Sequence, residues 1–148
     1  MRWTCVPFAE LGVQQLYDAL ALRSQVFVVE QNCVFLDIDG LDPQTLHLLG
    51  HGDDGALNAY ARLIPPGVKA PDALIGRVVT SPAARGGGTG RALMAEAVAR
   101  CERLWPGHAI ALHAQAHLER FYASFGFVPA GEPYIEDGIP HIEMRKET

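Results

Sequence analysis

Apolar residues recur along the chain with two different spacings, and the change from one to the other separates the predicted elements. Short apolar runs that are rich in β-branched residues are typical of strands. Such runs lie at 3–6, 47–50, 56–64, 74–80, 109–114, 127–128, 134–135 and 141–144. Apolar residues three and four positions apart predict helices that begin near Gly12, directly after Gly90 and at Leu118. This order predicts an α/β fold in which a mixed sheet carries helices on both faces.

The first predicted helix has a charged residue in its apolar stripe. The stripe consists of Val13, Leu16, Tyr17 and Leu20 and continues through Arg23 to Phe27. A guanidinium at such a position either reaches solvent along its aliphatic stem or acts as a functional cation, and the pattern leaves both interpretations open.

The stretch 73–105 combines a strand, a glycine-rich turn and a helix. The turn at 85–91 contains four glycines, and the helix that follows has an apolar stripe from Leu93 to Trp105. Unpaired amides and the helix dipole both favour an anion at a helix N-terminus. Residues 74–91 include three arginines and no carboxylate, so the local charge also favours an anion.

The glycine turn does not fit the two common nucleotide-binding motifs. No lysine follows the glycines as a Walker loop requires, and the spacing fails the dinucleotide fingerprint G-x-G-x-x-G. The turn does fit R-x-x-G-x-G at Arg85, Gly88 and Gly90. This pattern resembles the pyrophosphate loop of the GCN5-related N-acetyltransferases (GNAT superfamily), which bind acetyl-coenzyme A. The alternative is a turn that only joins strand to helix.

Two further segments carry the same resemblance. Residues 118–127, LERFYASFGF, are similar to the second motif of the family, roughly L-x-x-F-Y-x-x-x-G-F. The polar and apolar mixture at 22–42 resembles the ElaA-like branch. The resemblance implies a GNAT-type fold, with a mostly antiparallel sheet and a splayed central strand, in a single N-acetyltransferase domain spanning 1–148.

The resemblance also implies which residues bind acetyl-coenzyme A. The pyrophosphate is expected at the glycine loop, formed by Arg85, Gly86, Gly87, Gly88, Thr89 and Gly90. The pantetheine arm is expected to pair with the main chain of Arg77, Val78 and Val79, whose side chains then matter little. Gln115 is expected to hydrogen-bond the arm, although many relatives carry asparagine there.

Tyr122 matches the tyrosine that family members use as the general acid toward the leaving sulfur. A phenol with a pKa near 10 is well matched to a thiol. The alternative is that Tyr122 only packs among its aromatic neighbours. The general base stays open, because Ile110 occupies the position where some relatives have glutamate. The candidates for the base are Glu30, Asp39, His113 and His141.

The segment 26–42 is acidic and contains no basic residue. Its carboxylates are Glu30, Asp37, Asp39 and Asp42. They predict a cationic acceptor, a primary amine of a peptide or small molecule, bound by Glu30, Asp39 and His141. The implied reaction is direct transfer in a ternary complex. Two alternatives are a non-catalytic module that senses acyl-coenzyme A and a different nucleotide-binding protein.

Composition excludes several other classes. The net charge of −5 and the lack of basic runs argue against nucleic acid as a partner. Three cysteines without a C-x-x-C pair indicate neither a disulfide scaffold nor a metal site, and Cys101 is expected in the core. Neither a signal peptide nor a membrane-length apolar run is evident, which predicts a cytoplasmic protein without a membrane partner. The oligomeric state is left open, a homodimer included.

Overall fold

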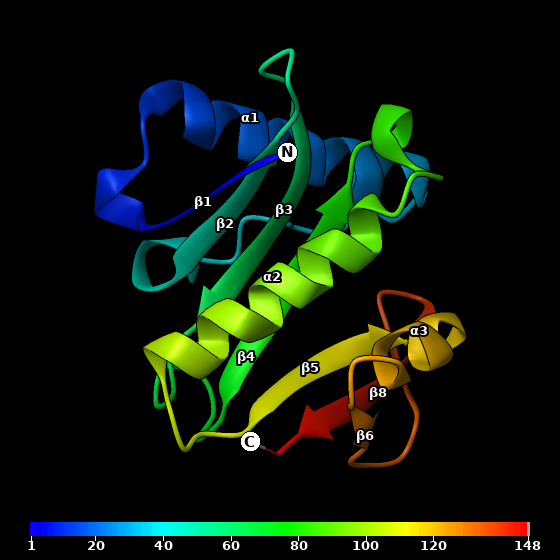
Figure 1. Ribbon diagram of the computed structural model, residues 1–148. Helices are drawn as coiled ribbons and strands as arrows, with labels where there is room; N and C mark the ends of the chain where they lie inside the picture. Colours follow the sequence, from blue (N-terminus) through cyan, green and yellow to red (C-terminus); the bar gives the residue numbers. More distant parts are fainter. Residues whose placement is uncertain (148) are drawn as a thin grey trace.

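The computed structural model describes residues 1–147, which form one eight-stranded sheet with helices on both faces (Figure 1). The strand order is β1-β2-β3-β4-β5-β8-β6, and β7 pairs with β8. The strands are β1 (Arg2–Pro7), β2 (Leu46–His51), β3 (Leu57–Ile64), β4 (Ala73–Thr80), β5 (Ile110–Gln115), β6 (Val128–Pro129), β7 (Tyr134–Glu136) and β8 (Ile139–Lys146). Only the β4–β5 pair is parallel among these strands, so the predicted mixed and mostly antiparallel sheet is confirmed.

The two long helices cover opposite faces of the sheet. In Figure 1, α2 (Thr89–Leu104) crosses in front of the strands and α1 (Val13–Arg23) lies behind them. Side chains alternate along β3: Ala61 packs into the core under α2, whereas Tyr60 packs into the core under α1. The short helix α3 (Glu119–Ala123) follows β5. Cys101 is buried in the core under α2, as predicted.

The buried stripe predicted for the first helix is wrong. Val13 and Tyr17 are 90% and 70% exposed. The buried residues are instead Ala19, Leu22 and Arg23, together with Val26 from the π-helical turn Ser24–Glu30 that continues α1. Positions 19, 22 and 26 have the same helical spacing as the predicted stripe, and the small side chain of Ala19 lies against the sheet. Spacing alone therefore did not select the correct face.

The central strands separate after two residue pairs. Only Ala73–Ile110 and Leu74–Ala111 connect β4 to β5, and beyond them the two strands diverge (Figure 1). A bulge adds one residue to β4 where it pairs with β3, and Arg77 adopts a left-handed conformation there with φ of 50°. The bulge also reverses the pleat: Ile75 packs toward α2, but Val79 packs toward α1. The predicted splayed central strand is thus present.

Candidate active site

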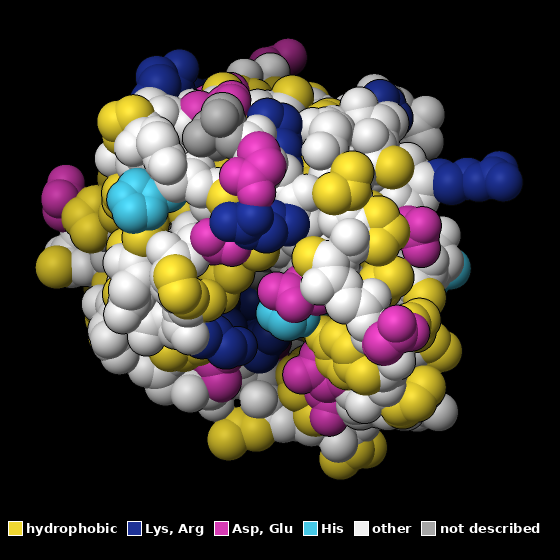
Figure 2. Space-filling model, turned by 90° about the horizontal axis from the view of Figure 1, so that it is seen from below, with side chains coloured by type: hydrophobic (Ala, Val, Ile, Leu, Met, Phe, Trp, Pro, Cys, Tyr) yellow, Lys and Arg dark blue, Asp and Glu magenta, His cyan; other side chains and the backbone are white. Residues whose placement is uncertain are grey.

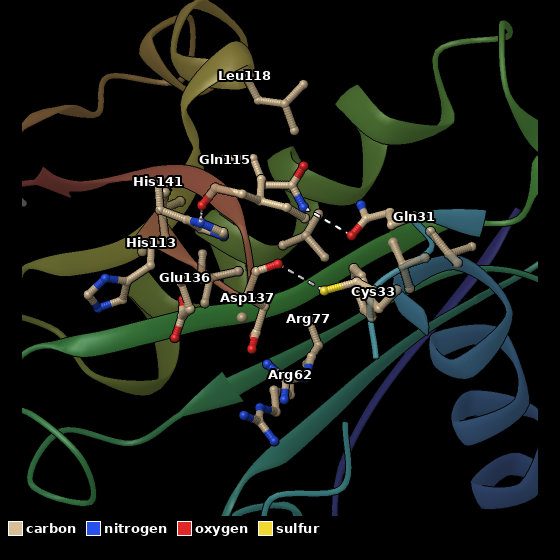
Figure 3. Close-up of a pocket in the computed structure, with 18 of the residues that line it drawn as sticks. Gln31, Cys33, Arg62, Arg77, His113, Gln115, Leu118, Glu136, Asp137 and His141 are labelled. Atoms are coloured by element: carbon tan, nitrogen blue, oxygen red, sulfur yellow. Dashed lines mark hydrogen bonds between the residues drawn. The ribbon is translucent and has the colours of Figure 1, made fainter. Parts of the chain in front are cut away.

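A cavity of about 940 Å³ occupies the gap between the diverging strands β4 and β5. Its walls come from the end of the first helix, from β4 and β5, and from the β7–β8 hairpin. Figure 2 shows Lys or Arg side chains deep in a hollow, with acidic and histidine side chains close to them. Figure 3 shows residues from these separate elements converging on it. Most of the predicted site residues line this cavity, but residues 86–90 of the glycine loop do not, and the lining reaches that loop only at Arg85.

The glycine loop presents a row of unpaired amides at the start of α2. Among the described residues, no acceptor receives a hydrogen bond from any backbone N–H of 86–91, and the helix ladder begins at Ala92. Gly86 and Gly88 have φ values of 90° and 82°, where side chains are strained. A Cβ at Gly87 would meet nothing within 4 Å. The loop thus has the open backbone and helix terminus that an anion requires.

Arg85 is not free in this structure, because Glu30 binds its guanidinium end-on. Nη1 and Nη2 donate to the two carboxylate oxygens at 2.8 and 2.7 Å, and Nη2 also donates to the Thr80 carbonyl at 3.4 Å. The hydrogen bond from Arg85 lowers the pKa of Glu30. A carboxylate with a lowered pKa is a weaker base, which disfavours Glu30 as the group that deprotonates an amine.

Tyr122 lines the cavity and is only 7% exposed. Its ring packs edge-on against Phe121, with the ring centroids 5.1 Å apart. Burial raises the pKa of Tyr122 to about 12. The phenol is therefore a weaker acid than a solvent-exposed tyrosine, whose pKa is near 10. It stays protonated throughout the neutral range.

Gln115, Val78 and Val79 also line the cavity, on its two opposite walls. The Gln115 amide nitrogen donates to the Gln31 side-chain oxygen at 3.4 Å, so the two amides meet across the gap (Figure 3). Val79 is buried, and Val78 packs against the core under α2. Their side chains are thus engaged by the protein, and the main chain of the splayed strand faces the gap.

Arg23 is fully buried, which rules out the interpretation that its guanidinium reaches solvent. Its Nε donates to Asp37 and its Nη1 donates to Asp42, both at 2.9 Å. The Tyr60 hydroxyl lies 3.5 Å from Nη1. Burial works against ionisation of Asp42, but the hydrogen bonds and charges of Arg23 and Arg62 outweigh it and lower the pKa. Arg23 thus forms buried ion pairs with two carboxylates of the acidic segment and is not among the residues that line the cavity.

The acidic segment is neutralised by arginines from distant strands, which corrects the expectation that it lacks countercharges. Arg62 donates to Asp39 at 2.9 and 2.5 Å and to Asp42 at 3.1 Å. The hydrogen bond from Arg62 lowers the pKa of Asp39, which therefore makes a poor base. Arg77 donates to the Asp37 carbonyl at 2.9 Å and forms an ion pair with its carboxylate at 2.8 Å. The Arg77 side chain therefore holds this segment on the sheet.

An imidazole on β8 is left with one free ring nitrogen. His141 Nδ1 lies 2.7 Å from the Ile139 carbonyl, which can only accept, so Nδ1 carries a hydrogen and the lone pair of the neutral ring is on Nε2. The Tyr134 ring stacks on the His141 ring, with the ring centroids 5.8 Å apart. The Tyr134 hydroxyl forms a hydrogen bond with His113 Nδ1 at 2.7 Å. His141 lines the cavity beside Gln115, its partner across the β5–β8 ladder (Figure 3).

Glu136 and Asp137 line the cavity although the sequence analysis did not select them. Both carboxylates are exposed, and neither forms a salt bridge within the described part of the chain. The Asp137 carbonyl accepts a hydrogen bond from the Cys33 thiol at 3.1 Å, which ties the β7–β8 turn to the segment after the first helix (Figure 3). The only sequence signal was the turn Glu-Asp-Gly at 136–138, which is common in hairpins.

Residues 1–147 contain neither a candidate metal cluster nor a helix that could span a membrane. No group of three or more His, Cys, Asp or Glu side chains there could hold a metal ion. No helix of that range is long and apolar enough to cross a membrane.

The family follows from comparison with known proteins. An acetyltransferase (GNAT) domain model matches residues 41–148. The chain belongs to the GNAT family of acetyltransferases, and its class is that of the acyltransferases, whose donor is an acyl-coenzyme A. The predicted family resemblance is confirmed.

The similarity to individual members extends over the whole chain. Protein ElaA of Escherichia coli is 47% identical, covering 100% of this chain and 97% of its own. Its crystal structure superimposes with a TM-score of 0.92 over 99% of each chain. An acyl-CoA N-acyltransferase from Pseudomonas aeruginosa gives a TM-score of 0.93 at 47% identity, again over 99% of each chain. The predicted likeness to the ElaA-like branch is therefore confirmed as well.

Proposed function

We propose that the protein is an acetyl-coenzyme A-dependent N-acetyltransferase that acts on a primary amine. The observation that carries the proposal is one continuous cavity lined by Arg85, Tyr122 and His141, whose end at Arg85 adjoins the unpaired amides of the glycine loop. Three demands of acetyl transfer are a cradle for an anionic carrier, a proton for the leaving thiolate and a base for the amine. The cavity offers one candidate for each of them.

In the proposed complex the pyrophosphate lies against the amides of 86–91 and against Arg85. Amide hydrogen bonds to a charged group contribute about 1.5–3 kcal/mol each, so three or four suffice for micromolar binding after ordering losses. The pantetheine arm runs along the main chain of Arg77, Val78 and Val79, where β5 no longer pairs with β4. Gln115 would exchange its contact with Gln31 for one with the arm.

The chemical step is direct attack of the neutral amine on the thioester carbonyl. A C–N bond forms, and collapse of the tetrahedral adduct breaks the C–S bond. Tyr122 gives its phenolic proton to the departing thiolate, and His141 Nε2 takes the proton that the amine loses. His141 is preferred to Glu30 and Asp39 as the base because both carboxylates are paired with arginines and have lowered pKa values.

The acceptor is proposed to be a primary amine of a peptide or small molecule. Glu30 and Asp39 are engaged by arginines, so the unpaired carboxylates of Glu136 and Asp137 are the stronger candidates for an ammonium group. They stand at the cavity wall near His141 (Figure 3). An amine held there lies next to the proposed base.

The test is a screen of amines, polyamines and peptides for release of free coenzyme thiol from acetyl-coenzyme A. At least one amine should accelerate release, and His141→Gln should lower kcat by about 10²-fold, the low end for a general base. Glu132→Gln, an exposed carboxylate away from the cavity, is the matched control. Tight binding of acetyl-coenzyme A with no acceleration by any amine would favour a sensor module instead.

A further inference from the structure

The Glu30–Arg85 ion pair stands at the junction between the first helix and the proposed cofactor loop. Glu30 ends the π-helical turn Ser24–Glu30, and Arg85 lies 55 residues further on, directly before the glycines. Both side chains line the cavity, and about two fifths of each is exposed. The pair therefore joins two segments that bound the same cavity.

The geometry leaves Arg85 without a paired set of donors for a phosphate. Guanidinium groups bind phosphate best through two parallel N–H groups. Glu30 occupies the end-on pair formed by Nη1 and Nη2. The Thr80 carbonyl takes a further hydrogen of Nη2, which blocks the pair that Nη2 makes with Nε. The remaining hydrogens, on Nε and Nη1, lie on different edges of the group.

We propose that Glu30 is a competing ligand for Arg85, which the pyrophosphate of coenzyme A must displace before Arg85 can bind it. This inference rests on the proposed function, because it presumes that Arg85 binds the cofactor. Glu30 then acts on cofactor affinity through Arg85 and is a positioning residue. The role differs from the acceptor binding that the sequence predicted.

Two physical effects oppose release of Glu30. The exposed ion pair is lost, and such pairs contribute modestly to stability. The freed carboxylate also stands at the C-terminal end of a helix, where the dipole disfavours negative charge. Removing the charge of Glu30 relieves both effects and removes one negative charge from the vicinity of an anionic ligand.

The test is calorimetry with coenzyme A on Glu30→Gln, Arg85→Gln, the double variant and the control Glu10→Gln. Glu10→Gln makes the same change in net charge at an exposed residue outside the cavity. We expect Glu30→Gln to bind about two- to fivefold more tightly than wild type at low salt, with a smaller difference at high salt. Glu10→Gln should not tighten binding. In the Arg85→Gln background the Glu30 substitution should have no effect.

Several outcomes would overturn the inference, and one of them separates it from the proposed function. Glu30 is not a competitor if Glu30→Gln binds coenzyme A no more tightly than wild type, or if the tightening persists in the Arg85→Gln background. In either case the proposed function still stands, provided that the wild-type protein binds coenzyme A. A wild-type protein that does not bind coenzyme A overturns the proposed function and this inference together. A merely structural role for Glu30 would lower the unfolding temperature and would not tighten binding.

Discussion

Replacing Gly87 with valine tests the glycine loop while leaving its fold unchanged. Gly86 and Gly88 are left-handed, so substitutions there strain the backbone and confound binding with folding. Gly87 is not in that conformation, and a Cβ added to it would meet nothing within 4 Å. Gly87→Val should therefore change the free energy of unfolding by about 0.5 kcal/mol or less.

Binding should respond much more strongly. A valine side chain at Gly87 would extend into the open space beside the loop amides, where the phosphate is proposed to bind. Loss of one amide hydrogen bond to a charged group costs about 1.5–3 kcal/mol, which is roughly a 10- to 150-fold weaker affinity for coenzyme A. Calorimetry measures the affinity, and urea denaturation measures the stability.

Gly131→Val is the matched control for Gly87→Val. Gly131 is exposed, lies outside the cavity and has only the Glu143 side chain within 4 Å of an added Cβ. Both variants should fold, and only Gly87→Val should lose affinity. Equal affinity of the two variants for coenzyme A, with both proteins folded, would refute the placement of the pyrophosphate on this loop.

Three further predictions concern Tyr122 and the ion pairs of Asp39 and Asp42. Tyr122→Phe should lower kcat with little change in the affinity for coenzyme A. In the wild-type enzyme, kcat should not fall between pH 8 and pH 10, because burial raises the pKa of Tyr122 to about 12. A descending limb in that range that disappears in Tyr122→Phe would contradict this. Asp42→Asn should lower the free energy of unfolding in urea by about 3–5 kcal/mol, since it leaves Arg23 and Arg62 short of a buried partner; a change below 1 kcal/mol would show that the network compensates. The pKa values of Asp39 and Asp42 are lowered in the folded protein. Their contribution to the free energy of unfolding is therefore complete above the unfolded pKa of about 3.9 and is lost as the pH falls below it. The free energy of unfolding should consequently change less between pH 5 and pH 3 in Asp42→Asn than in the wild-type protein.

The sequence by itself determined the element order and the glycine loop. Turn residues and apolar runs are local signals, so β4, α2 and β5 begin and end within about two residues of their predicted bounds. The R-x-x-G-x-G and L-x-x-F-Y patterns placed Arg85 and Tyr122 in a family, because both motifs are short and contiguous. The same local information was enough for Cys101 to be assigned to the core.

Tertiary structure decided which charges are free. Asp37, Asp39 and Asp42 have no basic neighbour within the segment 26–42. Their partners are Arg23 from α1, Arg62 from β3 and Arg77 from β4, which lie at least 14 residues away in the sequence. A single extra residue at the β4 bulge sets the direction of every side chain after it, and no local pattern signals that residue.

The choice of helix face and of the residues that line the cavity was decided in the same way. The stripe through Ala19 and the one through Val13 have equal spacing, and only contact with β2, β3 and β4 selects between them. His141, Glu136 and Asp137 line the same cavity as Arg85 because β8 pairs with β5 along the strand that diverges from β4. Pairing between distant strands is a property of the whole sheet, and so this part of the site became evident only when the chain was folded.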